Sequence, residues 1–245
     1  MAGAIYSRVV FPLRDSIPSS RPPVVNVLLI VACAAAFVFE LSLGRGLERF
    51  LLDYAFVPAR LFHSAYFGTS LLFNVKSAVL SMFLHAGWFH LIGNMWFLWI
   101  FGDNVEDVLG HVRFLVFYLA CGGAAALGQA VVAPDSGVPM VGASGAIAGV
   151  LGAYLVWFPW ARVRTLLFLG ILFTVAELPA TVFLVLWFVV QFFAGTLALA
   201  SAGSSAGGVA FFAHVGGFLA GAIAAFTLRR LGLVRPRTRY ATPEG

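Results

Sequence analysis

Long apolar stretches, separated by short polar or proline-containing segments, dominate the chain from residue 24 onwards. About 20 apolar residues cross the hydrocarbon core of a bilayer as a helix, so six of these stretches predict membrane-spanning helices. They cover residues 24–43, 88–108, 112–132, 141–158, 179–200 and 209–231. The pattern therefore predicts an all-α membrane protein with six transmembrane helices.

Other segments fit this scheme less simply. Residues 44–87 form a long first loop with apolar patches, for which we expect amphipathic helices at the membrane interface. Residues 165–176 are apolar but too short to cross, so we predict an interfacial segment there. The first 23 residues carry several arginines and prolines without an apolar core, which indicates a polar arm and not a cleavable signal. The expected domains are this arm (1–23), a six-helix domain (24–231) and a basic tail (232–245).

Composition agrees with a membrane protein, because 61% of the residues are hydrophobic and only 10% are charged, against roughly 25% charged in soluble domains. The net charge of +5 does not predict a nucleic-acid partner, since the basic residues flank apolar stretches. Cys33 and Cys121 lie inside such stretches and are expected to be small buried hydrophobes. No disulfide, metal or organic cofactor is predicted.

The basic residues also predict orientation, because cytoplasmic flanks are enriched in Lys and Arg. Eleven of the 15 fall on one side of the predicted spans: Arg8, Arg14, Arg21, Arg113, Arg162, Arg164, Arg229, Arg230, Arg235, Arg237 and Arg239. On the other side are Arg45, Arg49, Arg60 and Lys76. We expect a multi-pass protein of a bacterial inner (cytoplasmic) membrane, with both termini in the cytoplasm.

Four polar side chains enter the predicted spans from the outer face. Ser144 lies roughly 5 Å into its span and His214 roughly 8 Å into another, at 1.5 Å per helical residue. His90 and Asn94 share one face of a third span, because they are four residues apart. Ionisable groups inside a membrane are costly and point to function. The common depth therefore favours one site over four unrelated packing roles.

A serine hydroxyl needs a neighbouring base to act as a nucleophile, and histidine is the usual one. His90 and Asn94 would supply donors for an oxyanion. Taken singly, Ser144 could equally be a small residue in a helix-packing seam, and each histidine a packed side chain with a backbone partner. No acidic residue is expected at the depth of His214, so the sequence favours a Ser–His dyad over a triad.

Small residues would let the two helices meet closely enough for this chemistry. Gly142 and Gly145 flank Ser144, and they allow unusual backbone angles beside it. Further along the two spans lie Gly149, Gly217 and Gly221. We expect these glycines to line the packing surface at the site.

These motifs together resemble the rhomboid family of intramembrane serine proteases, over most of the stretch from residue 23 to residue 231. The motifs are Ser81-Met82-Phe83-Leu84-His85, His90-x-x-x-Asn94, Gly102-Asp103-Asn104-Val105-Glu106, Gly142-Ala143-Ser144-Gly145 and Ala213-His214-x-x-Gly217-x-x-x-Gly221. The resemblance implies a six-helix rhomboid-like bundle with a long interfacial first loop. It implies Ser144 as nucleophile, His214 as base and acid, and an oxyanion hole formed by His90, Asn94 and the Ser144 N–H. Substrates would be transmembrane segments of single-pass or other membrane proteins in the lipid bilayer, cut near their outer end.

Two departures from the family pattern bear on this reading. Many members carry an aromatic residue four positions after the serine, where this chain has Ala148, so His214 must be held by another group, for example an aromatic from a different helix. Some members have a Trp-Arg pair in the first loop, which has no tryptophan here before Trp88.

We expect the glycine- and serine-rich loop 201–208 to act as a lid, and the helix carrying Trp187 and Gln191 to act as a lateral gate. The alternatives are a proteolytically inactive rhomboid-like protein that binds transmembrane helices, and a small transporter, for which the sequence has neither paired intramembrane charges nor broken repeats.

Overall fold

The computed structural model describes residues 10–169, 172–201 and 210–236. Its elements, in chain order, are β1 (Val10–Asp15), α1 (Val24–Ser42), the 3-10 turn η1 (Gly44–Gly46), α2 (Leu47–Tyr54), α3 (Pro58–Phe62), α4 (Ser64–Phe67), α5 (Leu71–Ser81), α6 (Trp88–Leu109), α7 (His111–Val132), α8 (Ser144–Trp157), β2 (Arg162–Leu169), β3 (Leu172–Pro179), α9 (Ala180–Ser201) and α10 (Phe211–Arg230). The protein is therefore mostly helical.

Each of the six predicted spans coincides largely with one helix: α1, α6, α7, α8, α9 or α10. Within the described residues, three of them, α1, α7 and α10, are both long and apolar enough to cross a membrane by length and composition. Helix α8 differs most from its predicted span, since it begins at Ser144 and has only 14 residues. At 1.5 Å per residue it is roughly 21 Å long.

The prediction of an all-α fold is wrong at one end of the molecule, where β1, β2 and β3 form an antiparallel sheet in that order. The segment predicted as interfacial makes up most of the β2–β3 hairpin, and the predicted polar arm supplies β1. Val163 and Thr165 on one sheet face are fully buried, and the Trp96 indole N–H donates to the Pro12 carbonyl at 2.6 Å. Apolar residues on both sheet faces hide the two-residue alternation that would have indicated strands.

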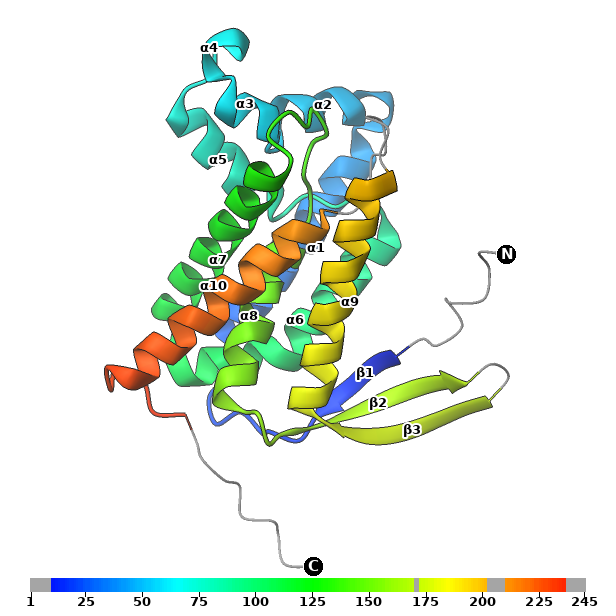
Figure 1. The fold of residues 1–245 in the computed structure, drawn as a ribbon, viewed down its shortest axis with the longest axis vertical. Helices are drawn as coiled ribbons and strands as arrows, with labels where there is room; N and C mark the ends of the chain where they lie inside the picture. Colours follow the sequence, from blue (N-terminus) through cyan, green and yellow to red (C-terminus); the bar gives the residue numbers. More distant parts are fainter. Residues whose placement is uncertain (1–9, 170–171, 202–209, 237–245) are drawn as a thin grey trace, which may run out of the picture.

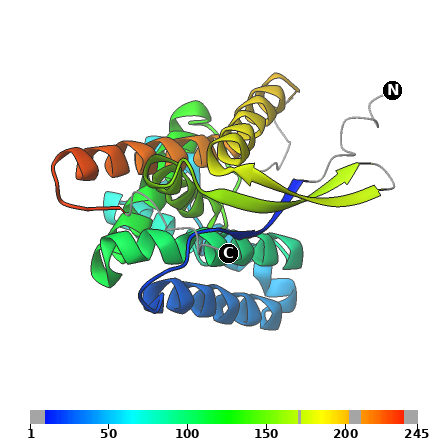
Figure 2. The same ribbon diagram turned by 90° about the horizontal axis from the view of Figure 1, so that it is seen from below.

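Helices α6, α7, α9 and α10 surround α8 (Figure 1). Seen from below, α1 lies along one side of the bundle and α9 and α10 along the other, with α6 and α7 between them (Figure 2). Ala148, Val150, Leu151 and Ala153 of α8 have no exposed surface. A helix buried on every side is typical of the core of a bundle, so residues that α8 carries are held rigidly.

The first loop folds into the short helices α2 to α5 at the end of the molecule opposite the sheet (Figure 1). This loop is joined to the segment before α8, because the Met140 N–H donates to the Phe56 carbonyl at 2.8 Å. The Phe56 N–H in turn donates to the Ser81 hydroxyl at 2.7 Å. The loop therefore packs directly against the residues that lead into α8.

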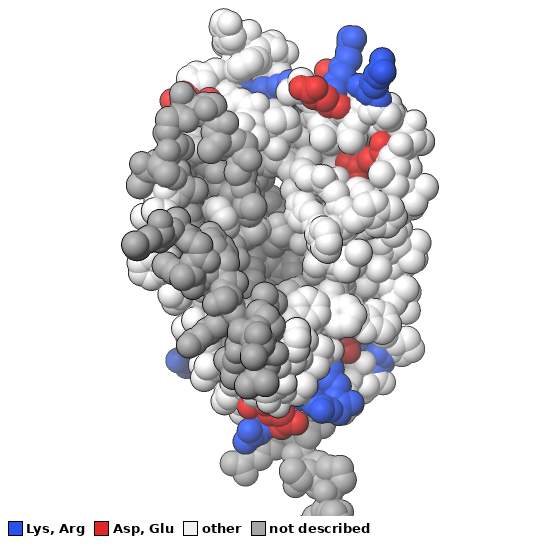
Figure 3. All heavy atoms as spheres, turned by 90° about the vertical axis from the view of Figure 1, so that its right-hand side faces the viewer, with Lys and Arg blue, Asp and Glu red and all other residues white. Residues whose placement is uncertain are grey.

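The polar run at the end of α6 holds the start of α1. The buried Glu106 carboxylate accepts hydrogen bonds from the Val25 and Asn26 N–H groups, at 2.9 and 2.7 Å, which satisfies unpaired amides of the first turn. The next residue, Asp107, accepts a hydrogen bond from the Ser20 hydroxyl at 2.7 Å. On the face seen in Figure 3, charged side chains gather toward the two ends and leave a largely uncharged band between them, as expected for a protein that crosses a bilayer.

Candidate active site

Ser144 and His214 lie within hydrogen-bonding distance of each other, on two different helices. The Ser144 Oγ and His214 Nε2 atoms are 2.7 Å apart. Ser144 is the first residue of α8, and His214 lies in the first turn of α10. Because a helix start leaves backbone N–H groups without helical partners, the Ser144 hydroxyl lies beside free donors.

Glycines bring the backbones of α8 and α10 together. A Cβ atom added to Gly217 would lie 2.0 Å from the Gly145 carbonyl oxygen, and one added to Gly221 would lie 2.0 Å from that of Gly149. A side chain on Gly149 would also collide with Cys121 of α7. These glycine contacts, here called the α8–α10 seam, fix the separation between Ser144 and His214.

Gly142 brings His90 and Asn94 of α6 close to the start of α8. Its φ of +121° disfavours any residue with a side chain, and an added Cβ would lie 2.6 Å from the His90 ring. The same position is 3.5 Å from Asn94 Nδ2, a buried donor that has no hydrogen-bond partner within the described residues. A buried donor without a partner is costly unless it serves a group that arrives later, so it is available to a bound oxyanion.

The other side of the His214 ring contacts α9. The Gln191 Oε1 atom lies 2.6 Å from His214 Nδ1, and the Trp187 and His214 rings have their centroids 6.0 Å apart. From the sequence, these two residues are predicted only as parts of a gate. Trp187 is an aromatic residue from a different helix that lies beside the His214 ring, where Ala148 leaves the family's aromatic position empty. Gln191 could have been noticed as the only side-chain amide in the apolar stretch 179–200.

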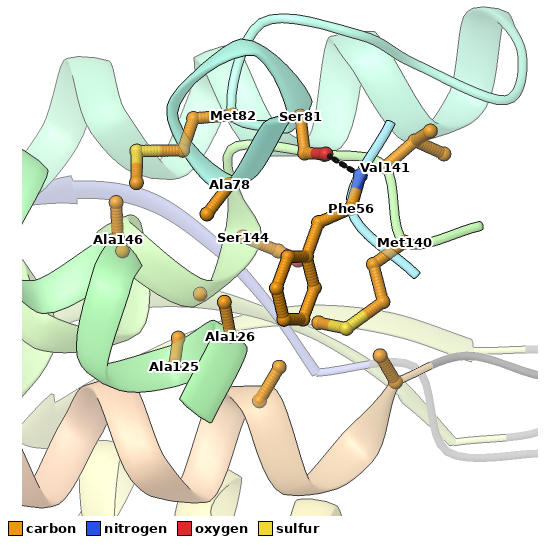
Figure 4. A pocket seen from close by; sticks show the side chains of 15 residues that line it. Phe56, Ala78, Ser81, Met82, Ala125, Ala126, Met140, Val141, Ser144 and Ala146 are labelled. Atoms are coloured by element: carbon orange, nitrogen blue, oxygen red, sulfur yellow. Dashed lines mark hydrogen bonds between the residues drawn. The ribbon is translucent and has the colours of Figure 1, made fainter. Parts of the chain in front are cut away.

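A cavity of about 40 Å³ opens beside Ser144. Its walls are mostly small residues, among them Ala78, Gly122, Ala125, Ala126, Gly145, Ala146 and Ala213, together with Phe56, Met82 and Met140. Figure 4 shows the Phe56 ring and the Met140 side chain next to each other, and both pack against Ala126. The first-loop residue Phe56 is a lining residue that the motif analysis did not identify.

The predicted lid, residues 201–208, lies almost entirely outside the described residues. No group of three or more His, Cys, Asp or Glu side chains suited to a metal ion occurs in residues 10–169, 172–201 and 210–236. The described site thus consists of a hydroxyl, imidazoles, amides and backbone N–H groups.

These features define a class: a mostly helical membrane protein in which a serine and a histidine meet at the buried ends of two helices. A rhomboid domain model matches residues 73–231, a stretch that contains Ser144, His214, His90 and Asn94. The chain belongs to the rhomboid family.

Curated relatives match shorter segments. The chain is 38% identical over 96 residues to rhomboid-like protein 11, chloroplastic, of Arabidopsis thaliana. This alignment covers 38% of this chain and 34% of that protein. It is 46% identical over 72 residues to the rhomboid protease GluP of Bacillus subtilis, covering 29% of this chain and 14% of that protein. It is 43% identical over 72 residues to the putative rhomboid protease YdcA of the same organism, covering 29% of this chain and 36% of that protein. The alignments thus span about a third or less of these relatives.

Proposed function

We propose that this protein is an intramembrane serine protease that cuts transmembrane segments of other membrane proteins near the outer membrane face. The observation that carries the proposal is the 2.7 Å contact between Ser144 Oγ and His214 Nε2, inside a bundle with a mainly apolar core. Two of the relatives are named as proteases, one of them as putative. The family assignment further supports activity on membrane-embedded substrates.

In this mechanism Gln191 sets the tautomer of His214. The Gln191 Oε1 atom can only accept, so His214 Nδ1 carries a proton and Nε2 is free to accept the proton of the Ser144 hydroxyl. Gln191 thus takes the orienting role that an aspartate has in the Ser-His-Asp triad. The amide adds no charge, which suits an apolar environment.

The reaction proceeds through an acyl-enzyme. Ser144 Oγ attacks the scissile carbonyl carbon as its proton passes to His214 Nε2, and the carbonyl oxygen becomes an oxyanion. Asn94 Nδ2, the His90 ring and the Ser144 N–H donate to that oxyanion. His214 then gives its proton to the leaving amine as the C–N bond breaks. Water, deprotonated by His214, attacks the ester and restores the Ser144 hydroxyl.

The cavity beside Ser144 supports a preference for small side chains at the residue before the cut. Its volume of about 40 Å³ and its alanine and glycine walls favour small side chains such as Ala, Ser or Gly. We expect a model substrate with alanine at this position to be cut at least about 10²-fold faster than one with phenylalanine, since a misfit of a few kcal/mol changes rates by that factor. Paired kcat/KM measurements on two such substrates check this.

The topology we infer has six crossing helices, with the sheet and both termini on the cytoplasmic side. Much of the described exposed surface of α9 is apolar, including Val182, Val185, Leu186, Val190 and Phe193. Lipid therefore reaches α9 directly, and a substrate helix can approach the site beside it. This supports α9 as the lateral gate.

The test is cleavage of a single-span substrate in liposomes. Ser144→Ala and His214→Ala should each lower kcat by about 10³-fold or more, as in other serine hydrolases. A fluorophosphonate should label wild type and not Ser144→Ala. Ser42→Ala and His63→Ala, which change exposed residues of the same types, are the controls. Full activity in Ser144→Ala would exclude the mechanism, and an inactive, unlabelled wild type would point to a rhomboid-like protein that binds transmembrane helices without cutting them.

A further inference from the structure

Three arginines stand on the outer face of the sheet, away from the catalytic site. Arg14 of β1 is the direct cross-strand partner of Arg164 of β2, and Arg162 lies two residues before Arg164 on the same face. Like charges directly opposite each other destabilise a sheet. The pairing therefore stores a repulsion that a bound anion would relieve.

Within the described part of the chain, none of these guanidinium groups forms a salt bridge. Among residues 10–169, 172–201 and 210–236, the salt bridges join Arg49 with Asp53, His63 with Asp135, and His111 with Glu106. Glu177, the cross-strand neighbour of Arg164, forms no salt bridge in that part of the chain. The site thus offers three cationic groups against one facing carboxylate.

The second carboxyl group of this region, that of Asp15, already accepts hydrogen bonds from the helix bundle. The Asp15 Oδ2 atom accepts hydrogen bonds from the Tyr154 hydroxyl at 2.5 Å and from Asn104 Nδ2 at 3.0 Å. Both donors belong to helices, so this carboxylate is directed to the bundle. It leaves the arginines uncompensated.

A hollow beside the arginines is large enough for a ligand. It has a volume of about 330 Å³ and is lined by Arg14, Arg162, Arg164, Glu177 and the turn residues 15–18. Charged side chains gather at this end of the molecule, below the uncharged band (Figure 3). A bilayer leaflet placed around the band would bring lipid headgroups to this level.

The rest of the same sheet face is apolar. Leu166 follows Arg164 in the alternation of β2, and its cross-strand partner is Val175, of which 47% is exposed. Phe173, two residues before Val175 on the same face, is 69% exposed. A face that is cationic at one end and apolar at the other matches an amphiphile better than a free ion.

We propose that Arg14, Arg162 and Arg164 bind the phosphate group of an anionic phospholipid of the cytoplasmic leaflet, with the apolar end of the sheet face against its acyl chains. Guanidinium groups bind phosphate with paired, charge-assisted hydrogen bonds. The bound headgroup would hold the hairpin, and through it the start of α9, at a fixed level in the membrane. This role is independent of peptide cleavage.

The experiment measures thermal unfolding of the full chain, in the Ser144→Ala background, in neutral detergent titrated with phosphatidylglycerol or phosphatidylcholine. Phosphatidylglycerol should raise the Tm at lower concentration than phosphatidylcholine does. Arg14→Gln/Arg164→Gln should raise the half-saturating concentration of phosphatidylglycerol by roughly fivefold for each guanidinium lost. Without anionic lipid this variant should be at least as stable as its parent, because the repulsion is gone.

The matched control is Arg229→Gln/Arg230→Gln, which removes two arginines from the end of α10 on the same side of the membrane. It should leave the phosphatidylglycerol response unchanged. An equal loss in this control would overturn the site in favour of general attraction to the surface. Equal responses to the two lipids, or full reproduction of the effect by inorganic phosphate with phosphatidylcholine, would overturn the lipid assignment.

Discussion

Helix α10 carries His214 and helix α9 contacts its ring, but the two helices are held in different ways. Helix α10 meets α8 backbone to backbone, with Gly217 and Gly221 against the carbonyls of Gly145 and Gly149. Helix α9 meets α10 through long side chains, with Trp187 and Phe188 against Phe218. The backbone contact between α8 and α10 leaves no room for a side chain. The side-chain contact between α9 and α10, in contrast, can be broken by side-chain rotation.

For the proposed protease, this difference separates two requirements of an enzyme that admits a helical substrate. Ser144 Oγ and His214 Nε2, the proposed reacting atoms, lie on the tight seam, which fixes the distance between them. Gln191, the proposed orienting group, is on the helix that is easier to move. Displacing α9 to admit a substrate would therefore loosen His214, and its return would restore the orientation before bond cleavage.

The largest effect is expected from a side chain in the seam. Gly217→Ala would bring a methyl group to 2.0 Å from the Gly145 carbonyl oxygen, and overpacking against backbone should cost about 3 kcal/mol or more. The variant should lose its folded state in detergent and its activity together. Thermal unfolding and cleavage rates would show this.

The matched control for that change is Gly123→Ala in α7, where an added Cβ meets nothing within 4 Å. It should be neutral or stabilising by about 0.5–1 kcal/mol, since alanine is the better helix former. Equal Tm values for the two variants would mean that the seam is not tightly packed.

A smaller effect, confined to activity, is expected at the α9 contact. Gln191→Leu keeps the size of the side chain but removes the acceptor for His214 Nδ1, so kcat should fall by about 10²-fold while KM and Tm change little. Gln191→Glu restores an acceptor and should recover most of kcat. Steady-state cleavage and the rate of fluorophosphonate labelling distinguish the variants, and an unchanged kcat in Gln191→Leu would remove Gln191 from the mechanism.

The smallest effect concerns the far end of α8, which Tyr154 ties to Asp15. Burial, with a contribution from Asp103, raises the pKa of Asp15 from 3.8 to about 7. Between about pH 4 and 7, the Asp15 side chain is protonated in the folded state but has lost its proton in the unfolded state. Asp15 therefore makes the free energy of unfolding fall as the pH rises through that window.

Asp15→Asn should remove that fall. The Tm difference between pH 5 and pH 8 should shrink by about 2–4 °C, the shift that 1 kcal/mol produces in a chain of this size. The comparison needs only thermal unfolding at two pH values. A pH dependence identical to that of wild type would show that another group titrates there.

The long helices and the residues around Ser144 were predictable because their signals are local. Twenty-residue apolar runs predict helices directly, and His90 with Asn94 share a face by spacing alone. The sheet was not predictable in the same way, since β1 and β2 pair residues as distant as Val10 and Leu167. Gln191 is predicted from the sequence only as part of a gate. Its contact with His214 depends on how α9 and α10 pack, which a single sequence does not encode by spacing.

The short length of α8 sets a fixed distance between Ser144 and the end of the helix beside the sheet. Its 14 residues set Ser144 roughly 21 Å from the helix end beside the sheet. If the sheet stays at the level of the lipid headgroups, a substrate segment that runs alongside α8 would be cut at that distance from the headgroups. The cut position would then not be set by the substrate sequence alone. Substrates would then be selected partly by the number of residues between their cytoplasmic membrane boundary and the cut position. Inserting one helical turn between these two points would move the cut to a residue nearer the cytoplasmic end of the substrate.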